Sequence, residues 1–500
     1  MCGLVAIAGK GEPELLREML GRIEHRGPDG RDVARTGDVL LGHARLAIVD
    51  VEGGRQPMFN ETGDLAVAFN GEIYNHRALR APLEGRHRFS SRSDTEVLVH
   101  LYEEEAEDML PRLDGMFALA VAGPRGLLLA RDPLGIKPLY YGTRGGLLLA
   151  ASELKAFPPM DDLRMLPAGH AVFNGGEPWA FSQPLDIRDP LRDPPLEVVL
   201  DGLRRRLEDA VVKRLMADVP VGVFLSGGLD SSIVAALMRP HVDVLHSFAA
   251  GMEGAPDLEA ARRVAAHLGT VHHEAVYSET DVEESLPAVI RHLESFDAPL
   301  VRSAVPGWFV ARLAARHVKV VLTGEGADEL FAGYEYLSRL GGEALRAEIR
   351  AITRGLQDTN LQRTDRMTMA HGIEGRVPFL DLALVRFALR LAPDLVAPRS
   401  DRPEKWLLRE AFRNLLPREI LARKKMKFSE GAGSARLSLD RVRSEVSEAE
   451  YERERQVAPG VVLRSPEELH YFRIWRRELG PRVPVDLVGR TRDRSAAVEP

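Results

Sequence analysis

The first third of the chain consists of short apolar runs separated by turn-forming residues. Residues 3–8 and 66–69 are almost entirely apolar, and residues 42–50 resemble a further strand that presents a single arginine. A polar segment that begins at Ser93 precedes a helical pattern at residues 97–104. The pattern predicts β-strands joined by turns, with a helix inserted among them.

The second half of the chain has a different pattern, in which strand-like and helix-like segments alternate. An amphipathic helix is predicted first, and a buried strand follows it. This alternation is typical of a parallel sheet flanked by helices. The predicted elements are a helix at 196–215, a strand at 219–225, a helix at 231–238, a strand at 244–251, a helix at 258–268, a strand at 272–277, helices up to residue 316 and a strand at 318–323.

A stretch rich in proline and charge, residues 182–195, has no apolar period and indicates an exposed connection. A chain of 500 residues also exceeds the size at which one hydrophobic core keeps growing. We therefore expect one domain at 1–185 and another at 196–480. Residues 481–500 are polar and aperiodic, so we expect a disordered tail there.

The composition favours small-molecule chemistry. Charged residues make up 28% of the chain and the net charge is −7, which argues against a general nucleic-acid or membrane-surface protein. The sequence has no apolar run long enough to span a membrane and no signal-peptide pattern, so we expect a cytoplasmic protein. The His272-His273 pair should point to opposite faces of a strand, and we interpret it as structural.

Cys2 is the only cysteine, which excludes an internal disulfide. Removal of Met1 would give Cys2 a free α-amine with a pKa of about 7.7 to 8, able to accept the thiol proton near neutral pH. Cys2 would then carry its own base as a nucleophile. The alternative is a small buried hydrophobic residue at the start of a strand.

Three other polar positions in this half have complementary chemistry. Arg45 could bind a carboxylate through its guanidinium group. Asn70 and Gly71, expected in a turn, offer an amide and a backbone N–H that together could form an oxyanion hole. Asp94 is either a helix cap or a ligand for an ammonium group. Each of these residues taken singly is more often structural.

In this order, these segments resemble the class II glutamine amidotransferase domain, an N-terminal-nucleophile fold of two stacked antiparallel sheets. The similarity covers residues 1–3, 25–29, 45–50, 70–75, 93–94 and 131–140. It implies that Cys2 is the nucleophile and that Asn70 and Gly71 are the oxyanion donors. It also implies that Arg45 binds the α-carboxylate of glutamine and that Glu72 and Asp94 bind its α-ammonium group. The implied glutamine-binding residues are Arg45, Ile48, Val49, Asn70, Gly71, Glu72 and Asp94.

A glycine turn at residues 226–228 separates the predicted strand from the following helix. Such a turn directs backbone N–H groups and the positive end of the helix at one place, which suits phosphate. The segment has no P-loop lysine, so serine hydroxyls would contact the phosphates, and the Asp230 carboxylate indicates a cation such as Mg²⁺. The alternative is an ordinary turn in which Asp230 or Ser231 caps the helix.

Seven consecutive residues of this turn and helix resemble the PP-loop of the ATP pyrophosphatases. These enzymes cleave ATP between the α- and β-phosphates and adenylate a substrate. The resemblance implies an α/β domain that binds ATP. The residues that match are Ser226, Gly227, Gly228, Asp230, Ser231 and Ser232, together with Leu229.

A second acidic loop, residues 323–334, follows the last predicted strand. Ligands of open α/β sheets bind beyond the carboxyl ends of the strands, so this loop should face residues 226–232. Asp328 is then a candidate second Mg²⁺ ligand beside Asp230. Glu325 could orient ammonia or accept its proton. Helix capping by these acids is the alternative.

The combination of an ammonia-releasing half with an adenylating half resembles the asparagine synthetase family over almost the whole chain. Further matching segments are residues 366–370, 373–381, 405–409 and 423–428. The resemblance implies a catalytic role for Glu325 and for Lys425, which would neutralise the departing pyrophosphate. A solvated basic turn is the alternative for the segment that contains Lys425. The resemblance further implies adenosine contacts from Leu225, Ala250, Thr323 and Gly324, and acceptor contacts from Arg302 and Glu374.

The implied reaction is the glutamine- and ATP-dependent amidation of aspartate through an acyl-adenylate, with release of glutamate, AMP and pyrophosphate. ATP and Mg²⁺ would be the cofactors, glutamine and aspartate the other substrates, and the assembly a homodimer that binds no nucleic acid and no membrane. The hydroxyl residues that the family tends to carry before the arginine are replaced by Asp297-Ala298-Pro299-Leu300-Val301. A different acceptor carboxylate therefore remains an alternative, as does a glutamine-sensing or scaffold protein without activity.

Overall fold

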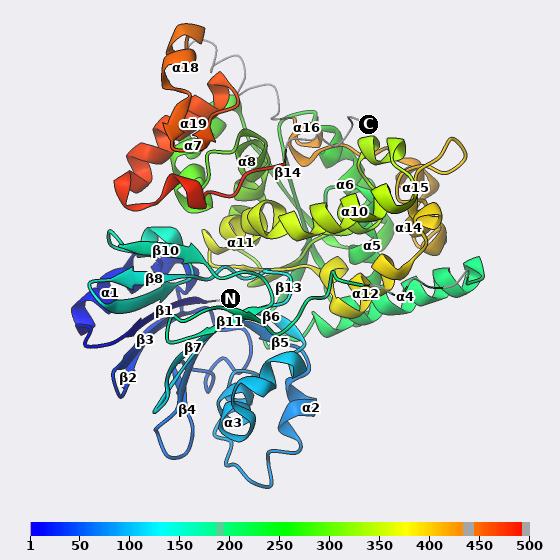
Figure 1. Ribbon diagram of the computed structural model, residues 1–500. Coiled ribbons are helices and arrows are strands. Elements are labelled where there is room, and N and C mark those ends of the chain that lie inside the picture. The colour runs from blue at the N-terminus through cyan, green and yellow to red at the C-terminus, as the bar shows by residue number, and fades with distance from the viewer. Residues whose placement is uncertain (1, 188, 190, 192–193, 434–444, 493–500) are drawn as a thin grey trace.

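The computed structural model describes residues 2–187, 189, 191, 194–433 and 445–492. A two-sheet unit fills the lower left of Figure 1, and a parallel sheet with its helices lies above it and to the right. The arrangement is the predicted one, an α+β sandwich of the N-terminal-nucleophile kind followed by an α/β unit with C-terminal helices. The fold class is therefore confirmed.

The first unit contains two six-stranded sheets with antiparallel pairing. Apolar side chains such as Leu4, Leu41 and Ala120 lie between the sheets and form a closed core. One sheet has the order β10 (Asp162–Met165), β8 (Tyr140–Arg144), β9 (Leu147–Ala151), β1 (Gly3–Ala8), β3 (Val39–Arg45) and β2 (Gly30–Thr36). The other has the order β12 (Trp179–Ala180), β11 (His170–Phe173), β7 (Gly126–Arg131), β6 (Gly115–Gly123), β5 (Ala66–Ile73) and β4 (Met58–Phe59).

Helices cover the outer faces of this sandwich. Leu16 and Met19 of α1 (Pro13–Gly21) pack on the outer face of the first sheet. Two helices, α2 (His76–Arg80) and α3 (Glu96–Glu105), contribute to a separate core with the second sheet. The apolar period of residues 97–104 thus forms the predicted helix, one residue longer at each end.

One sequence-based expectation about this sheet is wrong. We expected a turn at Asn70 and Gly71, but β5 continues through both residues and pairs with β6 as far as Ile73. A Cβ on Gly71 would lie only 2.0 Å from the Met116 carbonyl oxygen of the neighbouring strand. The glycine therefore permits close approach of two strands rather than a reversal of the chain.

The second unit has a five-stranded parallel sheet with the order β15-β14-β13-β16-β17. The strands are β13 (Val221–Phe224), β14 (His246–Gly251), β15 (Val271–Val276), β16 (Val320–Leu322) and β17 (Glu374–Arg376). The chain order reverses between β13 and β16, and a ligand crevice is expected at the carboxyl ends of strands on either side of such a point. The predicted parallel sheet is present; β13, β14 and β16 are two or three residues shorter than the predicted strands, and β15 has the predicted length but begins one residue earlier.

Helices pack on both faces of this sheet. One face carries α4 (Leu196–Lys213), α5 (Leu229–Met238) and α6 (Pro256–Leu268). On the opposite face, α8 (Ala298–Ala314) packs on the sheet, and α7 (Glu279–Leu293) and α19 (Pro466–Leu479) pack on α8 and on each other. The remaining helices are α9 (Ala327–Leu330), α10 (Gly342–Arg354), α11 (Asn360–Met369), α12 (Leu382–Arg390), α13 (Pro393–Val396), α14 (Trp406–Ala411), α15 (Arg418–Ala422), α16 (Phe428–Gly431) and α18 (Glu448–Glu454), and the small sheet is β18 (Gln456–Ala458) with β19 (Val461–Val462).

The expected disorder after residue 480 is wrong for residues 481–492. Val483 and Val488 are buried in the second core, and the Thr491 N–H and hydroxyl donate to the Asp297 carboxylate at 3.1 and 3.0 Å. Val483, Val485, Leu487 and Val488 pack into this core, although their spacing follows neither a helical nor a strand period. Residues 493–500 lie outside the described part of the chain. None of the described helices is both long and apolar enough to span a bilayer.

Candidate active sites

The Cys2 thiol lies at the start of β1, buried between the sheets and the second unit. Its side chain lies 3.9 Å from the Leu46 carbonyl oxygen, and its carbonyl accepts a hydrogen bond from Arg26 Nε at 3.0 Å. Burial raises the pKa of the thiol. Cys2 is thus held in one place, and its deprotonation needs a nearby base or a bound substrate.

Asn70 is positioned beside Cys2 by the antiparallel sheet. The backbone N–H of Cys2 donates to Asn70 Oδ1 at 2.9 Å, so the side-chain oxygen is already occupied. Asn70 is fully buried, and its Nδ2 makes no hydrogen bond within the described residues. An unpaired buried donor next to a thiol is suited to stabilise a developing oxyanion.

Two buried carboxylates, Glu72 and Asp94, lie on the same side of this centre. The Ile73 N–H donates to Asp94 Oδ2 at 2.8 Å, and Arg376 Nη2 lies 3.2 Å from Glu72 Oε1. Burial raises the pKa of Asp94 to about 6 and also raises the pKa of Glu72, with a contribution from Glu374. Glu72 Oε2 makes no hydrogen bond in the described chain, so this pair can accept an ammonium group.

Arg45 ends β3 on the rim of the same centre. Its guanidinium donates to the backbone carbonyls of Asp50 and Val51, both at 2.8 Å, and no carboxylate of the described chain pairs with it. The following residues Ile48 and Val49 lie in the loop against the second unit, where the Asp218 N–H donates to the Ile48 carbonyl at 2.9 Å. Arg45 therefore remains available to a carboxylate ligand.

The PP-loop-like turn joins β13 to α5 with a left-handed Gly227, at φ 66°. A Cβ at this position would lie 2.4 Å from the backbone of Ala260 in α6, so only glycine fits. The Ser232 hydroxyl donates to the Gly228 carbonyl at 2.7 Å, and Ser226 N–H donates to Ser231 Oγ at 3.3 Å. The serines organise the loop internally, which leaves its remaining N–H groups for an anion.

The two acidic loops meet as expected at the carboxyl ends of β13 and β16. A Cβ on Gly324 would lie 2.8 Å from the Asp230 side chain. The Asp230 and Asp328 carboxylates contact one ammonium group, with Lys405 Nζ 2.5 Å from Asp230 Oδ2 and 2.7 Å from Asp328 Oδ1. Lys425 also pairs with Asp328. Two carboxylates that share one cation are close enough to share another.

A cavity of about 470 Å³ opens over these loops. Its wall is polar on the side of the PP-loop-like turn, whereas the side of α8 combines apolar residues such as Leu300 and Val310 with Arg302. Gly227 and Ser232, which stabilise the turn, do not line the cavity. The predicted residues that line the cavity are Leu225, Ser226, Gly228, Asp230, Ser231, Ala250, Arg302, Thr323, Gly324, Glu325, Asp328 and Lys425.

The two acceptor candidates are not brought together. Arg302 lines the cavity, but its Nε donates to Glu467 Oε1 at 2.8 Å and its Nη2 pairs with the second oxygen. Glu374 is fully buried at the start of the edge strand β17, where it pairs with Arg376 at 2.5 Å. Its negative charge contributes to the raised pKa of Glu72. Its position favours a role beside the amidotransferase centre over contact with an acceptor in the cavity.

Several residues around the cavity were not predicted as site residues. Lys405 is 3% exposed and directly precedes α14, with a positive φ of 55°. Arg363 pairs with Glu325. The Glu329 carboxyl is buried, which raises its pKa to about 7 with help from Asp328. The sequence indicated Lys405 through a segment shared with the family and Glu329 through the acidic loop at residues 323–334. It gave no indication of Arg363, because its partner Glu325 lies 38 residues away along the chain.

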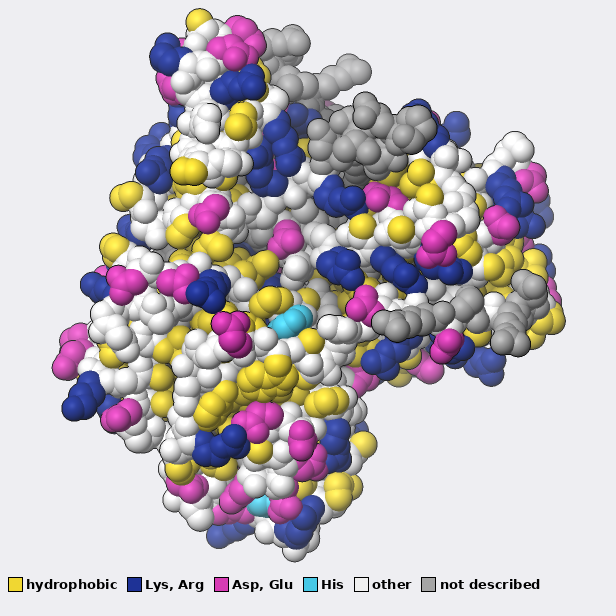
Figure 2. All heavy atoms as spheres, in the orientation of Figure 1, with side chains coloured by type: hydrophobic (Ala, Val, Ile, Leu, Met, Phe, Trp, Pro, Cys, Tyr) yellow, Lys and Arg dark blue, Asp and Glu magenta, His cyan; other side chains and the backbone are white. Residues whose placement is uncertain are grey.

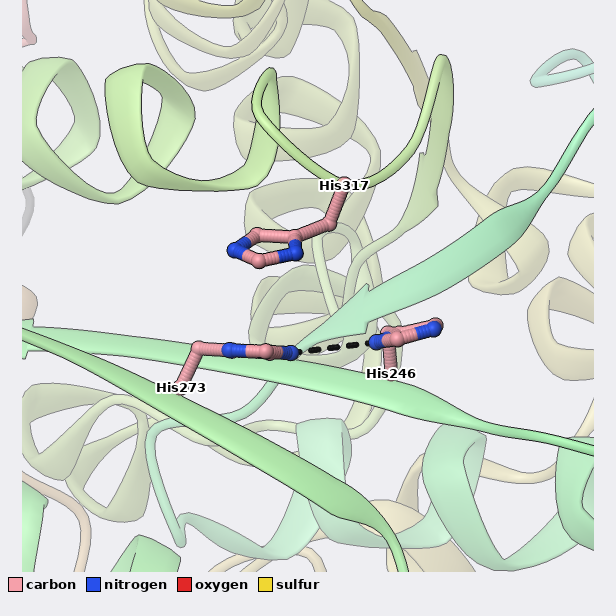
Figure 3. A group of neighbouring side chains, drawn as sticks. All are labelled: His246, His273 and His317. Carbon is pink, nitrogen blue, oxygen red and sulfur yellow. Dashed lines mark hydrogen bonds between the residues drawn. The ribbon is translucent and has the colours of Figure 1, made fainter.

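The His272-His273 doublet divides between the two faces of β15, as expected from strand geometry. His272 contacts Ser247 Oγ at 2.9 Å, whereas His273 contacts His246 Nδ1 at 3.0 Å and stacks on His317 (Figure 3). These groups lie near the amino ends of the strands, so they belong to neither active-site candidate.

Comparison with known proteins defines the class. Residues 1–172 match the glutamine amidotransferase domain, and residues 202–350 and 340–479 match asparagine synthase. The chain belongs to the asparagine synthase family and carries an amino-terminal glutamine amidotransferase domain. It is 40% identical over 470 residues to the glutamine-hydrolyzing asparagine synthetase of Triphysaria versicolor, covering 87% of this chain and 78% of that protein.

Other members of the family are similar to the same extent. A glutamine-hydrolyzing asparagine synthetase of Sandersonia aurantiaca is 39% identical over 471 residues, which is 87% of each chain. One from Arabidopsis thaliana is 38% identical over 463 residues, with 87% of this chain and 78% of that protein covered. The similarity thus spans both units, so each unit has counterparts in a single relative.

Proposed function

We propose that this protein is a glutamine-hydrolysing asparagine synthetase, which converts aspartate, glutamine and ATP into asparagine, glutamate, AMP and pyrophosphate. The observation that supports this most strongly is the presence of two complementary centres in one chain. Cys2 lies beside the Asn70 amide N–H donor, which makes no hydrogen bond within the described residues, and the Asp230 and Asp328 carboxylates converge in the cavity. We assign the glutamine chemistry to residues 1–185 and the ATP chemistry to residues 196–480.

In the first centre, the Cys2 thiolate attacks the side-chain amide of glutamine. Asn70 Nδ2 and the Gly71 N–H stabilise the oxyanion, while Arg45 and the Glu72–Asp94 pair hold the two charged groups of the amino acid. Ammonia leaves, and water then releases glutamate from the thioester. The burial of this centre keeps the ammonia away from bulk solvent.

In the second centre, the acceptor carboxylate attacks the α-phosphorus of ATP and pyrophosphate leaves. A carboxylate needs this step because its own leaving group would be oxide, whereas the acyl-adenylate releases AMP. The PP-loop-like turn binds the phosphates, and Lys425 neutralises the departing pyrophosphate. Ammonia then attacks the acyl carbon, with Glu325 positioned to accept its excess proton.

Mg²⁺ fits the carboxylate pair of this centre. Asp230 Oδ1 is buried and makes no hydrogen bond within the described residues, so it is an available hard oxygen ligand next to Asp328. We propose that these two residues hold Mg²⁺, which supplies charge neutralisation on the polyphosphate when bound. Lys405 occupies the place between the carboxylates and would shift towards the phosphates.

One observation favours a second candidate, an amidotransferase of the same mechanism with another acceptor. Two nitrogens of the Arg302 guanidinium pair with the two carboxylate oxygens of Glu467. Leu300, and not a hydroxyl residue, lines the cavity wall next to it. An acceptor carboxylate must therefore compete with Glu467 for Arg302. Substrates of different shape could exploit the apolar wall.

An acceptor screen distinguishes the two candidates. The full chain is incubated with ATP, Mg²⁺ and glutamine plus single carboxylic acids, and AMP and pyrophosphate are measured together with the amide product. Aspartate should give AMP and asparagine in equal amounts. Release of AMP with another acid and none with aspartate would favour the second candidate, and no release with any acid would contradict both.

A further inference from the structure

Two histidines and two glutamates converge on the outer face of the first unit, away from both proposed centres. His100 and Glu103 lie one turn apart on α3, His87 lies in the loop before that helix, and Glu61 lies in the turn between β4 and β5. The lower end of the molecule in Figure 2, which corresponds to the α2–α3 region of Figure 1, shows a histidine among acidic side chains. Three separate segments thus contribute to one cluster.

The spacing of the donor atoms matches a first coordination sphere. His87 Nδ1 lies 3.5 Å from Glu61 Oε1 and 3.6 Å from Glu103 Oε2, and His100 Nδ1 lies 3.5 Å from Glu61 Oε2. One donor atom from each of the four residues lies within 4.8 Å of every other. Tetrahedral ligands at 2.0–2.1 Å from zinc are about 3.3 Å apart, so the donor atoms would move together by up to about 1.5 Å on metal binding.

His100 provides an independent indication of a ligand. Its side chain is 1% exposed, and neither ring nitrogen makes a hydrogen bond within the described residues. A buried imidazole normally pairs at least one nitrogen, because an unpaired polar atom in the interior destabilises the fold. Here the nearest acceptors are the Glu61 and Glu96 carboxylates at 3.5 and 3.9 Å, which are ion-pair distances longer than a normal hydrogen bond.

The local charge also favours a cation. Glu104 Oε1 lies 3.0 Å from His87 Nε2, and Glu96 Oε1 lies 3.9 Å from His100 Nε2. With Glu61 and Glu103, four carboxylates surround the two imidazoles. Arg86 pairs with Glu104 on the exposed side, and the Arg88 backbone N–H donates to Glu61 Oε1 at 2.6 Å. A divalent cation at the centre would balance the remaining negative charge.

A second histidine cluster differs in geometry. His273 and His317 are stacked with their ring centroids 3.9 Å apart and 26° between their planes, and Figure 3 shows His317 above the ring of His273. Imidazole nitrogens bind a metal in the plane of the ring, so two nearly parallel stacked rings cannot direct their lone pairs at one ion. His246, His273 and His317 are better explained as a stack of rings.

We propose that Glu61, His87, His100 and Glu103 form a binding site for a zinc-class divalent cation, with two imidazole and two carboxylate ligands. Mixed nitrogen and oxygen donors of this kind suit Zn²⁺, and less well Mg²⁺, which prefers oxygen ligands and water. The four ligands belong to the protein, so the site is structural. It links the β4–β5 turn and the loop at residue 87 to α3, the helix that follows Asp94. The proposal does not depend on the reaction catalysed.

The test is metal binding by the full chain without a histidine tag. The protein is stripped with a chelator and dialysed against Zn²⁺, and bound metal is measured by mass spectrometry. One equivalent should bind, and Co²⁺ in its place should give the intense visible absorption of a tetrahedral site. Zn²⁺ should also raise the midpoint of thermal unfolding.

Two variants with partly exposed side chains avoid loss of folding. Glu103→Gln and Glu61→Gln should each lower Zn²⁺ affinity at least tenfold and remove the thermal shift. Glu105→Gln, on the same helix with the same charge change, and His273→Ala, in the other cluster, should bind Zn²⁺ like the unsubstituted protein. Binding that is lost in His273→Ala but kept in Glu103→Gln, or no binding at all, would overturn the proposal.

Discussion

Lys405 Nζ lies 2.5 Å from Asp230 Oδ2, in the place between two carboxylates where Mg²⁺ is proposed to bind. The same ammonium group lies 2.7 Å from Asp328, and Lys405 is almost completely buried. In the absence of a ligand, this lysine offsets the repulsion between two largely buried carboxylates, which are 14% and 13% exposed. The Lys405 ammonium group therefore takes the place of the metal ion between the two carboxylates.

The first prediction concerns this ammonium group. Lys405→Met should lower the free energy of unfolding by about 3–5 kcal/mol, because it leaves the largely buried Asp230 carboxylate without a cationic partner, whereas Asp328 keeps Lys425. Mg²⁺ should restore much of the loss in the variant and have a smaller effect on the unsubstituted protein. Chemical denaturation with and without Mg²⁺ measures this. Lys427→Met removes a largely exposed lysine and is the control. An equal loss with and without Mg²⁺ would contradict the shared cation site.

A second prediction separates the two centres. Cys2→Ala should reduce glutamine-dependent synthesis by at least about three orders of magnitude, because the covalent step is lost. Synthesis from ammonium chloride should stay within about twofold of the unsubstituted protein, since the ATP centre uses none of the residues around Cys2. Product formation with each nitrogen source measures this. Loss of both activities would refute the division of tasks.

The third prediction tests Asn70 Nδ2, which makes no hydrogen bond in the part of the chain that the structure describes. Asn70→Ala should lower kcat for glutamine hydrolysis by about 10² to 10³, the usual effect of removing one oxyanion donor. KM for glutamine should change less, because the donor acts mainly on the transition state. Steady-state glutaminase kinetics give both values, and ammonia-dependent synthesis serves as the internal control. A change confined to KM would mean that Asn70 binds glutamine without stabilising the oxyanion.

The fourth prediction concerns pH. Burial raises the pKa of Asp94 to about 6, so its carboxyl binds a proton more readily in the folded protein than in the unfolded chain. Without glutamine, the contribution of this group to stability is therefore greatest below pH 4 and is lost as pH rises towards 6, by up to about 3 kcal/mol. Glutamine binding needs the ionised form, so KM for glutamine should rise as pH falls below 6.

Asp94→Asn provides the matched measurement for this effect. The variant should bind glutamine weakly at every pH, and its glutaminase KM should lose the dependence near pH 6. Its unfolding free energy should no longer fall between pH 4 and 6. If the unsubstituted protein and the variant show the same pH profiles, another group is responsible.

A fifth prediction addresses the acceptor. If Arg302 binds the acceptor carboxylate in competition with Glu467, Arg302→Ala should raise the acceptor KM about tenfold or more, the expected cost of losing one charged hydrogen bond. Glu467→Gln should act in the opposite direction and lower this KM, because the guanidinium is released. Glutaminase activity, measured alone, should not change in either variant. Effects of the same sign would indicate that the pair is only structural.

The sequence predicted much of the fold because the evidence for strands and helices is local. The apolar runs at residues 3–8 and 219–225 became β1 and β13, and the helix before residue 240 begins two residues earlier than expected. Asn70 was misplaced in a turn, since Asn-Gly is a turn signal in isolation. The neighbouring strand β6 overrode this preference by pairing with both residues.

The sequence by itself determined which residue types are present and in what order: one cysteine at position 2, a Ser-Gly-Gly turn before a helix, and an acidic loop after a strand. These patterns are sufficient for the fold class and the type of chemistry, because each depends on neighbours in the chain. Only the tertiary structure decided the partners across long separations, such as Lys405 with Asp230, Arg302 with Glu467 and Glu374 with the amidotransferase centre. The physical reason is that ion pairs and burial depend on distance in space, which packing sets and local sequence does not encode.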